Sequence, residues 1–451
     1  MGERTTVIGT ILAVVFQNEE NGYTVARIVT DDGEPVTVVG CIPCAAPGEE
    51  LILTGRYTTH PQHGEQFAAD EVERHMPTGE TEILNYLASG VVRGIGPATA
   101  QKLVDRFGAD TLDVLDGEPE RLRTIKGITD KRAREIAESW RELAGLRRVL
   151  DFLTKYDLPV GLAMQLFRRY GADAMDALRR NPYLLSGEAF GVDFSVSDEI
   201  ALSMGFSGDS SCRTEAGVLF ELSHNENNGH VFLPRPKLLA ATEQLIGAPP
   251  ELVEQALDTL ESRGAVAEER IARVDACYLR RMYLAESETA RRLLALRDAP
   301  RSQGRGVEKL IREMEEQQGI AYAPQQRQAV ELAARTGVLL LTGGPGTGKT
   351  TTVNAILQLL EHQADRVALC APTGRAAKRL SELTGRKAST IHRLLEVDYS
   401  GGVVSFIHND KNLLKCDVVI LDEMSMVDVK LFQALIAACL LYTSDAADDK
   451  A

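Results

Sequence analysis

The sequence predicts a multidomain protein: an N-terminal β-barrel, an all-α region, a mixed connector and a C-terminal α/β lobe. Three observations lead to this prediction. Residues 3–76 are rich in β-forming residues, and residues 78–205 contain an internal repeat with helical periodicity. A glycine-rich loop follows the apolar run that begins at residue 338. With 451 residues, the chain is long enough for about three domains.

The composition is that of an ordinary soluble protein. Hydrophobic residues make up 44% and charged residues 25%, which excludes a disordered or collagen-like chain. The formal net charge of -15 means that any contact with nucleic acid must come from local basic or backbone-amide surfaces. No apolar run reaches the roughly 20 residues that span a bilayer. Of seven scattered cysteines only Cys41 and Cys44 form a CxxC pair, which we interpret as ordinary strand-end and loop residues of a cytoplasmic protein.

Residues 3–76 contain the runs VIGTILAVVF, YTVARIVT, PVTVVGCI and ELILTGRYT, separated by turn-forming residues. Short strands at regular spacing predict a small barrel, with an OB-fold-like barrel as the leading candidate. The strands leave two roles open, because such a barrel can bind nucleic acid or serve only for docking.

Residues 78–205 contain an internal repeat. The segment FGADTLDVL, which begins at Phe107, reappears as YGADAMDAL beginning at Tyr170, an offset of 63 residues. A proline follows each copy, at Pro119 and Pro182. We therefore expect two multi-helix units of similar structure.

Two turns of the first unit resemble the helix-hairpin-helix family. In VVRGIGPATAQKLV two glycines flank an apolar residue, and a helix begins at Pro97 with free N–H groups that can bind a phosphate. LRTIKGITDKRAREIA is a second copy, in which Thr129 replaces the second glycine. In the second unit Gly161 and Gly191 lack the pattern, and we expect packing there. The residues expected to contact the DNA backbone are Gly94, Ile95, Gly96, Lys126, Gly127 and Lys131.

The sequence of the next two regions contains no specific functional motif. Residues 210–297 alternate helices with a short β-hairpin, which favours a winged-helix-like connector. Residues 298–320 are polar and charged, and we interpret them as a linker with an exposed helix.

Residues 321–438 are expected to form a P-loop (RecA-like) lobe, because VLLLTGGPGTGKTTTV places a glycine-rich loop between an apolar strand and a helix. Backbone N–H groups of such a loop surround phosphates, Lys349 reaches the β- and γ-phosphates, and the Thr350 hydroxyl is a ligand of Mg²⁺. ATP and Mg²⁺ are therefore the expected cofactors. The loop residues expected to bind nucleotide are Gly343, Gly344, Pro345, Gly346, Thr347, Gly348, Lys349, Thr350 and Thr351.

An acidic pair follows the buried strand predicted in CDVVILDEMSMVD. Apolar runs such as VVIL and VLLL are typical of parallel strands that are covered on both faces. Asp422 is expected to hold Mg²⁺, directly or through water, and Glu423 to orient and deprotonate the attacking water. Lys349, Asp422 and Glu423 are thus the predicted catalytic residues.

These motifs, in this order, resemble those of the RecD-like helicases of superfamily 1. APTGRAAKRL, TIHRLL and ILDEMSMVD are similar to motifs Ia, Ic and II of that family, and the resemblance extends from residue 3 to about 438. It implies a 5′-to-3′ ATP-dependent DNA helicase of repair or recombination, acting on single-stranded DNA or a junction with a 5′ tail. It also implies that Gln326 reads adenine and that Thr373, Arg375 and His392 contact single-stranded DNA.

Two other functions remain open. The chain could be a DNA-dependent switch or loader ATPase, although the sequence of motifs is more similar to that of translocases. It could also be a non-enzymatic DNA-junction-binding module, which the intact Lys349, Thr350, Asp422 and Glu423 disfavour. Hydrolysis of ATP stimulated by single-stranded DNA separates these functions.

The C-terminal end departs from the family pattern. The resemblance implies a second RecA-like lobe and later motifs, and we expect the chain to be truncated after motif II. Residues 439–451, which begin CLLYTSDAADD, are expected to be a non-native tail that resembles a translated sequencing adapter. On this expectation the 451-residue chain neither hydrolyses ATP at a useful rate nor unwinds duplex DNA.

Overall fold

The computed structural model describes residues 4–18, 22–60, 64–299, 306–344, 346–363, 366–398 and 405–439. The chain forms two compact units, Met1–Phe220 with Thr242–Val253, and Glu221–Ala241 with Glu254–Ala451. Within the described ranges, no helix is both long enough and apolar enough to cross a membrane.

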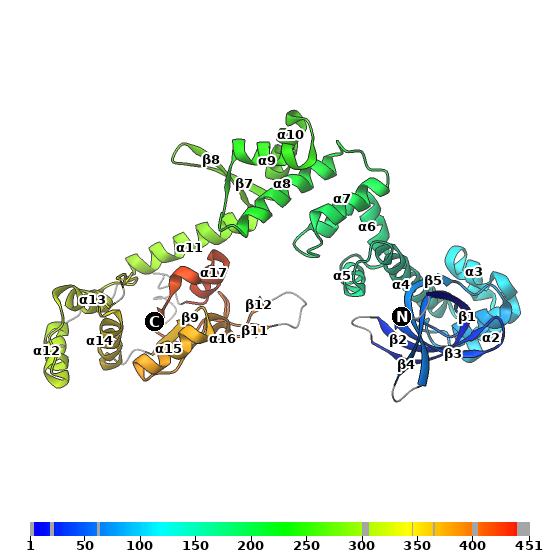
Figure 1. The fold of residues 1–451 in the computed structure, drawn as a ribbon, viewed down its shortest axis with the longest axis horizontal. Helices are drawn as coiled ribbons and strands as arrows, with labels where there is room; N and C mark the ends of the chain where they lie inside the picture. The colour runs from blue at the N-terminus through cyan, green and yellow to red at the C-terminus, as the bar shows by residue number, and fades with distance from the viewer. Residues whose placement is uncertain are drawn as a thin grey trace. The chain divides into compact units, whose positions relative to one another are not determined.

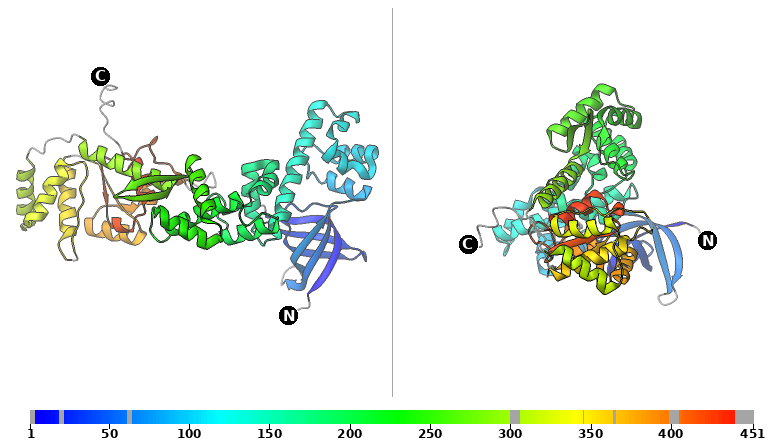
Figure 2. Two further views of the ribbon diagram at one scale, coloured as in Figure 1. Left: turned by 90° about the horizontal axis from the view of Figure 1, so that it is seen from above. Right: turned by 90° about the vertical axis from the view of Figure 1, so that its left-hand side faces the viewer.

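The first unit begins with the predicted OB-fold-like barrel, which is confirmed. Five strands close in the order β1-β2-β3-β5-β4, with β3 and β5 parallel and the other pairs antiparallel (Figures 1 and 2). Alternate apolar residues of the strands, among them Ile11, Ile28 and Phe67, fill its interior. The strands are Thr5–Gln17 (β1), Tyr23–Thr30 (β2), Pro35–Cys41 (β3), Glu50–His60 (β4) and Gly64–His75 (β5).

Two helical repeats follow the barrel, and their elements confirm the offset read from the sequence. α5 begins and ends 63 residues after α2, as 160 follows 97. Each repeat has its own apolar core, centred on residues such as Tyr86 and Leu103 in the first and Leu166 and Leu178 in the second. The elements are α1 Glu80–Ala88, α2 Pro97–Phe107, η1 Gly108–Asp110, α3 Thr111–Gly117, η2 Pro119–Thr124, α4 Asp130–Thr154, α5 Val160–Tyr170, η3 Gly171–Asp173, α6 Ala174–Arg180, η4 Pro182–Ser186 and α7 Phe194–Ser203.

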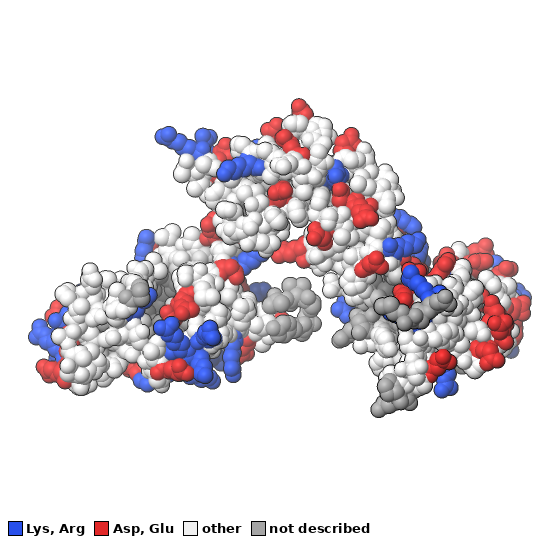
Figure 3. All heavy atoms as spheres, viewed as in Figure 1, with Lys and Arg blue, Asp and Glu red and all other residues white. Residues whose placement is uncertain are grey.

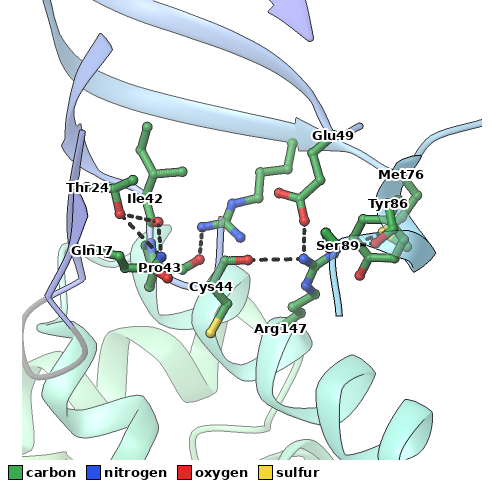
Figure 4. Close-up of polar contacts among 11 residues, drawn as sticks. Gln17, Thr24, Ile42, Pro43, Cys44, Glu49, Met76, Tyr86, Ser89 and Arg147 are labelled. Carbon is green, nitrogen blue, oxygen red and sulfur yellow. Dashed lines mark hydrogen bonds and ion pairs between the residues drawn. The ribbon is translucent and has the colours of Figure 1, made fainter. Parts of the chain in front are cut away.

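A buried ion pair joins the barrel to the first repeat (Figure 4). The Arg147 guanidinium, on α4, donates to the Glu49 carboxylate, which directly precedes β4, and to the Cys44 carbonyl oxygen at 3.1 Å. It also lies 5.1 Å from the centre of the Tyr86 ring. The side chains of Arg147 and Glu49 are only 10% and 1% exposed. Since an unpaired buried charge is costly, this pair fixes where the helix meets the barrel.

The connector has the element order of a winged helix, as predicted. Its short sheet has the order β6-β8-β7, with both pairs antiparallel. The elements are α8 Ser211–Glu226, β6 Leu233–Pro234, α9 Arg235–Ile246, α10 Pro250–Ser262, β7 Val266–Ile271, β8 Val274–Leu279 and α11 Arg280–Asp298.

The C-terminal lobe is built on a parallel sheet with the order β10-β9-β13, packed against α14 and α15. The VVIL run is strand β13, as predicted. The elements are α12 Val307–Gln318, α13 Pro324–Arg335, α14 Lys349–His362, β9 Val367–Ala371, α15 Gly374–Thr384, β10 Ala388–Thr390, α16 Ile391–Leu395, β11 Val397–Asp398, β12 Ser405–Phe406, β13 Val418–Leu421, η5 Met424–Met426 and α17 Val429–Ala437.

Two features of the lobe differ from the sequence prediction. α12 is not simply an exposed helix, because Val307, Ile311 and Met314 form a stripe that packs into the core with α13 and α14. The VLLL run is not a strand: within the described residues nothing pairs with it, and Leu340 is 77% exposed. Leu339 still packs against the core, although the run has no ladder partner among the described residues. The predicted non-native tail lies outside the described residues beyond Cys439, and stays a prediction.

Candidate nucleotide and DNA sites

The glycine-rich loop has the geometry of a phosphate site. Gly348 is the N-cap of α14 with φ 80°, and Gly346 has φ 77°, a left-handed conformation that glycine adopts without steric cost. Lys349 and Thr350, the first residues of α14, are exposed. The free N–H groups at the start of this helix therefore lie next to a cationic and a hydroxyl side chain, the combination that binds a polyphosphate. Pro345, also predicted to bind nucleotide, lies outside the described residues.

Gln326 lies against this loop. Its Nε2 is 3.4 Å from the Thr347 carbonyl oxygen, and its Oε1 accepts a hydrogen bond from the Ala323 N–H at the start of α13. A Cβ on Gly348 would come within 2.3 Å of Nε2, so a side chain there would displace the glutamine. The loop itself is braced by the Thr347 hydroxyl, which donates to the Gly344 carbonyl oxygen at 2.9 Å. The fold thus brings the predicted adenine-reading residue to the phosphate loop.

The acidic pair lies at the carboxyl end of β13. The Asp422 N–H donates to the Cys370 carbonyl oxygen at 3.0 Å, which aligns the ends of β13 and β9. Asp422 Oδ1 accepts a hydrogen bond from the Glu423 N–H, also at 3.0 Å. Glu423 has φ 54°, a strained conformation for a residue with a Cβ. Both carboxylates are exposed, so they are available to a metal ion and to water.

The residues expected to contact single-stranded DNA lie at the same edge of the sheet, because β9, β10 and β13 are parallel. Thr373 is the N-cap of α15, and its hydroxyl accepts from the Ala376 N–H at 3.2 Å, so it has a structural role as well. Arg375 is exposed on the first turn of α15, and His392 is exposed next to Phe406, with ring centres 5.9 Å apart. Figure 3 shows basic side chains gathered over α15, where Lys378 and Arg379 are exposed as well.

The first helical hairpins present two adjacent turns. Gly94 has φ 91° and Gly127 has φ 98°, and both are exposed. Lys126 and Lys131 are exposed beside the second turn. Ile95, in contrast, is 2% exposed and belongs to the core of the repeat, so only its backbone can face a ligand.

Two cations link these turns. The Arg132 guanidinium donates to the Gly94 carbonyl oxygen at 3.3 Å and to the Thr99 hydroxyl at 3.1 Å. Lys102, which the sequence pattern did not single out, donates to the Lys126 carbonyl oxygen at 3.3 Å. The sequence feature that could have identified Lys102 is its position within the first GIG hairpin, on the exposed side of α2. Side chains of each hairpin therefore contact the turn of the other directly.

The second repeat differs at the equivalent turn. Asp157, 63 residues after Gly94, has φ 53° and carries a carboxylate where the first repeat has an open glycine. A carboxylate repels phosphate. The expectation that the second repeat packs rather than binds DNA stays a prediction.

Comparisons with known proteins agree with this architecture. Four family models match: the OB-fold domain of the ATP-dependent DNA helicase YrrC over residues 4–77, a SAM-like helix-hairpin-helix tandem over 86–142, the HHH domain of the ATP-dependent RecD2 DNA helicase over 142–232, and an AAA domain over 326–445. The ATP-dependent RecD2 DNA helicase of Deinococcus radiodurans is 30% identical over 449 residues, 96% of this chain. The chain therefore resembles RecD2-like ATP-dependent DNA helicases in its barrel, its helix-hairpin-helix region and its P-loop lobe.

Other relatives match a smaller part of this chain. The RecBCD enzyme subunit RecD of Mycolicibacterium smegmatis is 38% identical over 36% of the chain, and the ATP-dependent DNA helicase dda of Enterobacteria phage T4 is 41% identical over 22%. The chain spans 62% of the length of the Deinococcus protein, 32% of the mycobacterial subunit and 23% of the phage helicase.

Proposed function

We propose that the C-terminal lobe binds ATP with Mg²⁺ and that the complete enzyme couples its hydrolysis to 5′-to-3′ movement along single-stranded DNA in repair or recombination. The observation that carries the proposal is the phosphate loop at the start of α14, in the same lobe as the acidic pair that ends β13. The direction of movement comes from the family resemblance.

Each residue has a distinct task in this proposal. Lys349 neutralises the β- and γ-phosphates, and the Thr350 hydroxyl with Asp422 would hold the metal ion, whose charge stabilises the transferred phosphoryl group. Glu423 orients the attacking water and takes its proton. The strained backbone at Glu423 is consistent with a carboxylate held for chemistry rather than for stability.

The ATP site is tested by binding a fluorescent ATP analogue to the 451-residue chain. Lys349→Ala should abolish Mg²⁺-dependent binding, since the loop then lacks its cation. Lys309→Ala removes an exposed lysine of α12 that forms an ion pair with Glu313, and this variant should bind like the parent. Equal binding by both variants would refute the nucleotide site.

We also propose that the first two hairpins bind the DNA backbone without sequence preference. Gly94, Gly96 and Gly127 offer backbone amides, and the basic residues nearby offer charge. Affinity for a DNA oligonucleotide should fall steeply with salt. Lys126→Ala combined with Lys131→Ala should reduce the slope of log affinity against log salt concentration by the equivalent of up to two released counterions. An unchanged salt slope in the double variant would count against this contact.

A further inference from the structure

Charge is unevenly distributed over the barrel. β1, β2 and β3 contain a single charged residue among them, Arg27, which is exposed. The acidic residues lie elsewhere, on the other two strands and in the turns. Those on the other two strands are Glu50, Glu65, Asp70, Glu71 and Glu73. The outward surface of the first three strands is therefore the part of the barrel that repels an anion least.

That surface also exposes large apolar side chains. Leu12 is 57% exposed, Val15 60%, Phe16 54% and Tyr23 44%. The register of β1 against β2 shifts at Leu12 and again at Val15, so each is the extra residue of a β-bulge. Since a bulge re-aims side chains that the regular pleat would place differently, the strand is built to present these residues outward.

The register brings the aromatic residues and the cation together. Phe16 lies opposite Val25 across the β1–β2 ladder. Tyr23 and Arg27 flank Val25 at two residues on either side, and therefore lie on the same face of β2. Phe16 and Tyr23 are thus diagonal neighbours, about 7–8 Å apart in this kind of ladder.

We propose that the β1–β3 face, defined by Leu12, Val15, Phe16, Tyr23 and Arg27, binds single-stranded DNA, with bases stacked on the two aromatic rings and a phosphate at Arg27. Proteins that bind single strands without sequence preference combine such stacking platforms with cationic groups, and OB-folds use the face of these strands. The inference rests on the proposed function, in which single-stranded DNA is the substrate.

The physics of this contact differs from that of the hairpins. One cation releases about one counterion, so affinity should change with salt by a logarithmic slope of only about -0.7. The hairpin surface carries several cations and should lose affinity much faster. At high salt, the stacking contact of the barrel is what remains.

The test uses the 451-residue chain and an oligodeoxythymidylate that carries one photoreactive iododeoxyuridine. Binding is measured over a salt series, and crosslinked peptides are located by mass spectrometry. Phe16→Ala and Tyr23→Ala should each weaken high-salt binding about 5- to 150-fold, the range for losing one stacked base. Tyr57→Ala, which removes a 46% exposed aromatic of β4 outside the face, should bind like the parent.

Crosslinks at Phe16 or Tyr23 would support the proposal. Crosslinks only at the hairpins or the C-terminal lobe, with parent-like binding by both variants, would overturn it and leave the proposed function intact. Loss of self-association in Phe16→Ala with unchanged DNA binding would instead assign the face to a second copy of the chain. No DNA binding by the parent, with ATP-analogue binding retained, would overturn both this proposal and the DNA contacts of the proposed function.

Discussion

Arg147→Met is expected to destabilise the barrel and first repeat by about 3–5 kcal/mol, the cost of leaving one member of a buried ion pair alone. The magnitude follows from the burial: the Glu49 side chain is 1% exposed, so its carboxylate cannot be rehydrated without opening the interface. The variant also removes the hydrogen bond to the Cys44 carbonyl oxygen and the contact with the Tyr86 ring.

The assay is urea unfolding followed by tryptophan fluorescence, because Trp140 is the one tryptophan of the sequence and lies in this unit. Its ring centre is 6.4 Å from that of Tyr86, which Arg147 covers. At about 2 kcal/mol per molar urea, the midpoint should fall by roughly 1.5–2.5 M. Arg148→Ala, at the exposed neighbouring position, should change stability by no more than about 0.5 kcal/mol.

A second variant separates the ion pair from general packing. Replacing both partners, Glu49→Leu with Arg147→Met, should recover most of the lost stability, since no charge is then buried. A loss below about 1 kcal/mol in Arg147→Met, or no recovery in the double variant, would refute the reasoning.

Three further predictions concern single sites. Hydrogen bonds from Arg213 at 2.8 and 2.9 Å hold the pKa of Asp198 below its usual value. This carboxylate therefore stabilises the fold above about pH 4, and the contribution is lost as the pH falls through the lowered pKa. Asp198→Asn should unfold more easily at pH 7, and its stability should depend less steeply on pH in the acid range. Glu423→Gly relieves about 1–2 kcal/mol of left-handed strain and adds about 0.5–1 kcal/mol of chain entropy cost, so thermal stability should hold or rise slightly; a loss above about 1 kcal/mol would contradict the strain. Ile311→Ala should cost about 2–5 kcal/mol in denaturant unfolding, against at most about 0.5 for the exposed Glu308→Ala; equal effects would mean that α12 is not part of the core.

Local patterns were sufficient for much of this protein. The 63-residue repeat, the alternating strands of the barrel and the glycine-rich loop before α14 were all readable in the sequence, because periodicity and glycine position report directly on local backbone geometry. The acidic pair was placed correctly at the end of a parallel strand for the same reason: a short apolar run followed by charge marks where a buried strand emerges.

Other features depend on which segments meet in space. Ile95 belongs to a motif that suggests a DNA contact, yet its side chain is in the core, and only the packing of α2 against its neighbours shows this. The VLLL run has the composition of a buried strand, but a strand exists only through hydrogen bonds to a partner, and no described segment provides one. The polar composition of α12 likewise led to the prediction of an exposed helix, although the helix has a buried apolar stripe.

The partners of long-range contacts were the least visible in the sequence. Nothing local distinguishes Glu49 and Arg147 from other charged residues, and their pairing across 98 positions arises only when the barrel and α4 close over them. The charge-poor β1–β3 face is similar: its defining residues lie on β1 and β2, and the register shifts between these strands decide which side chains lie together. Sequence determines what each segment can become, and burial against distant segments decides which of its side chains are left to meet a ligand.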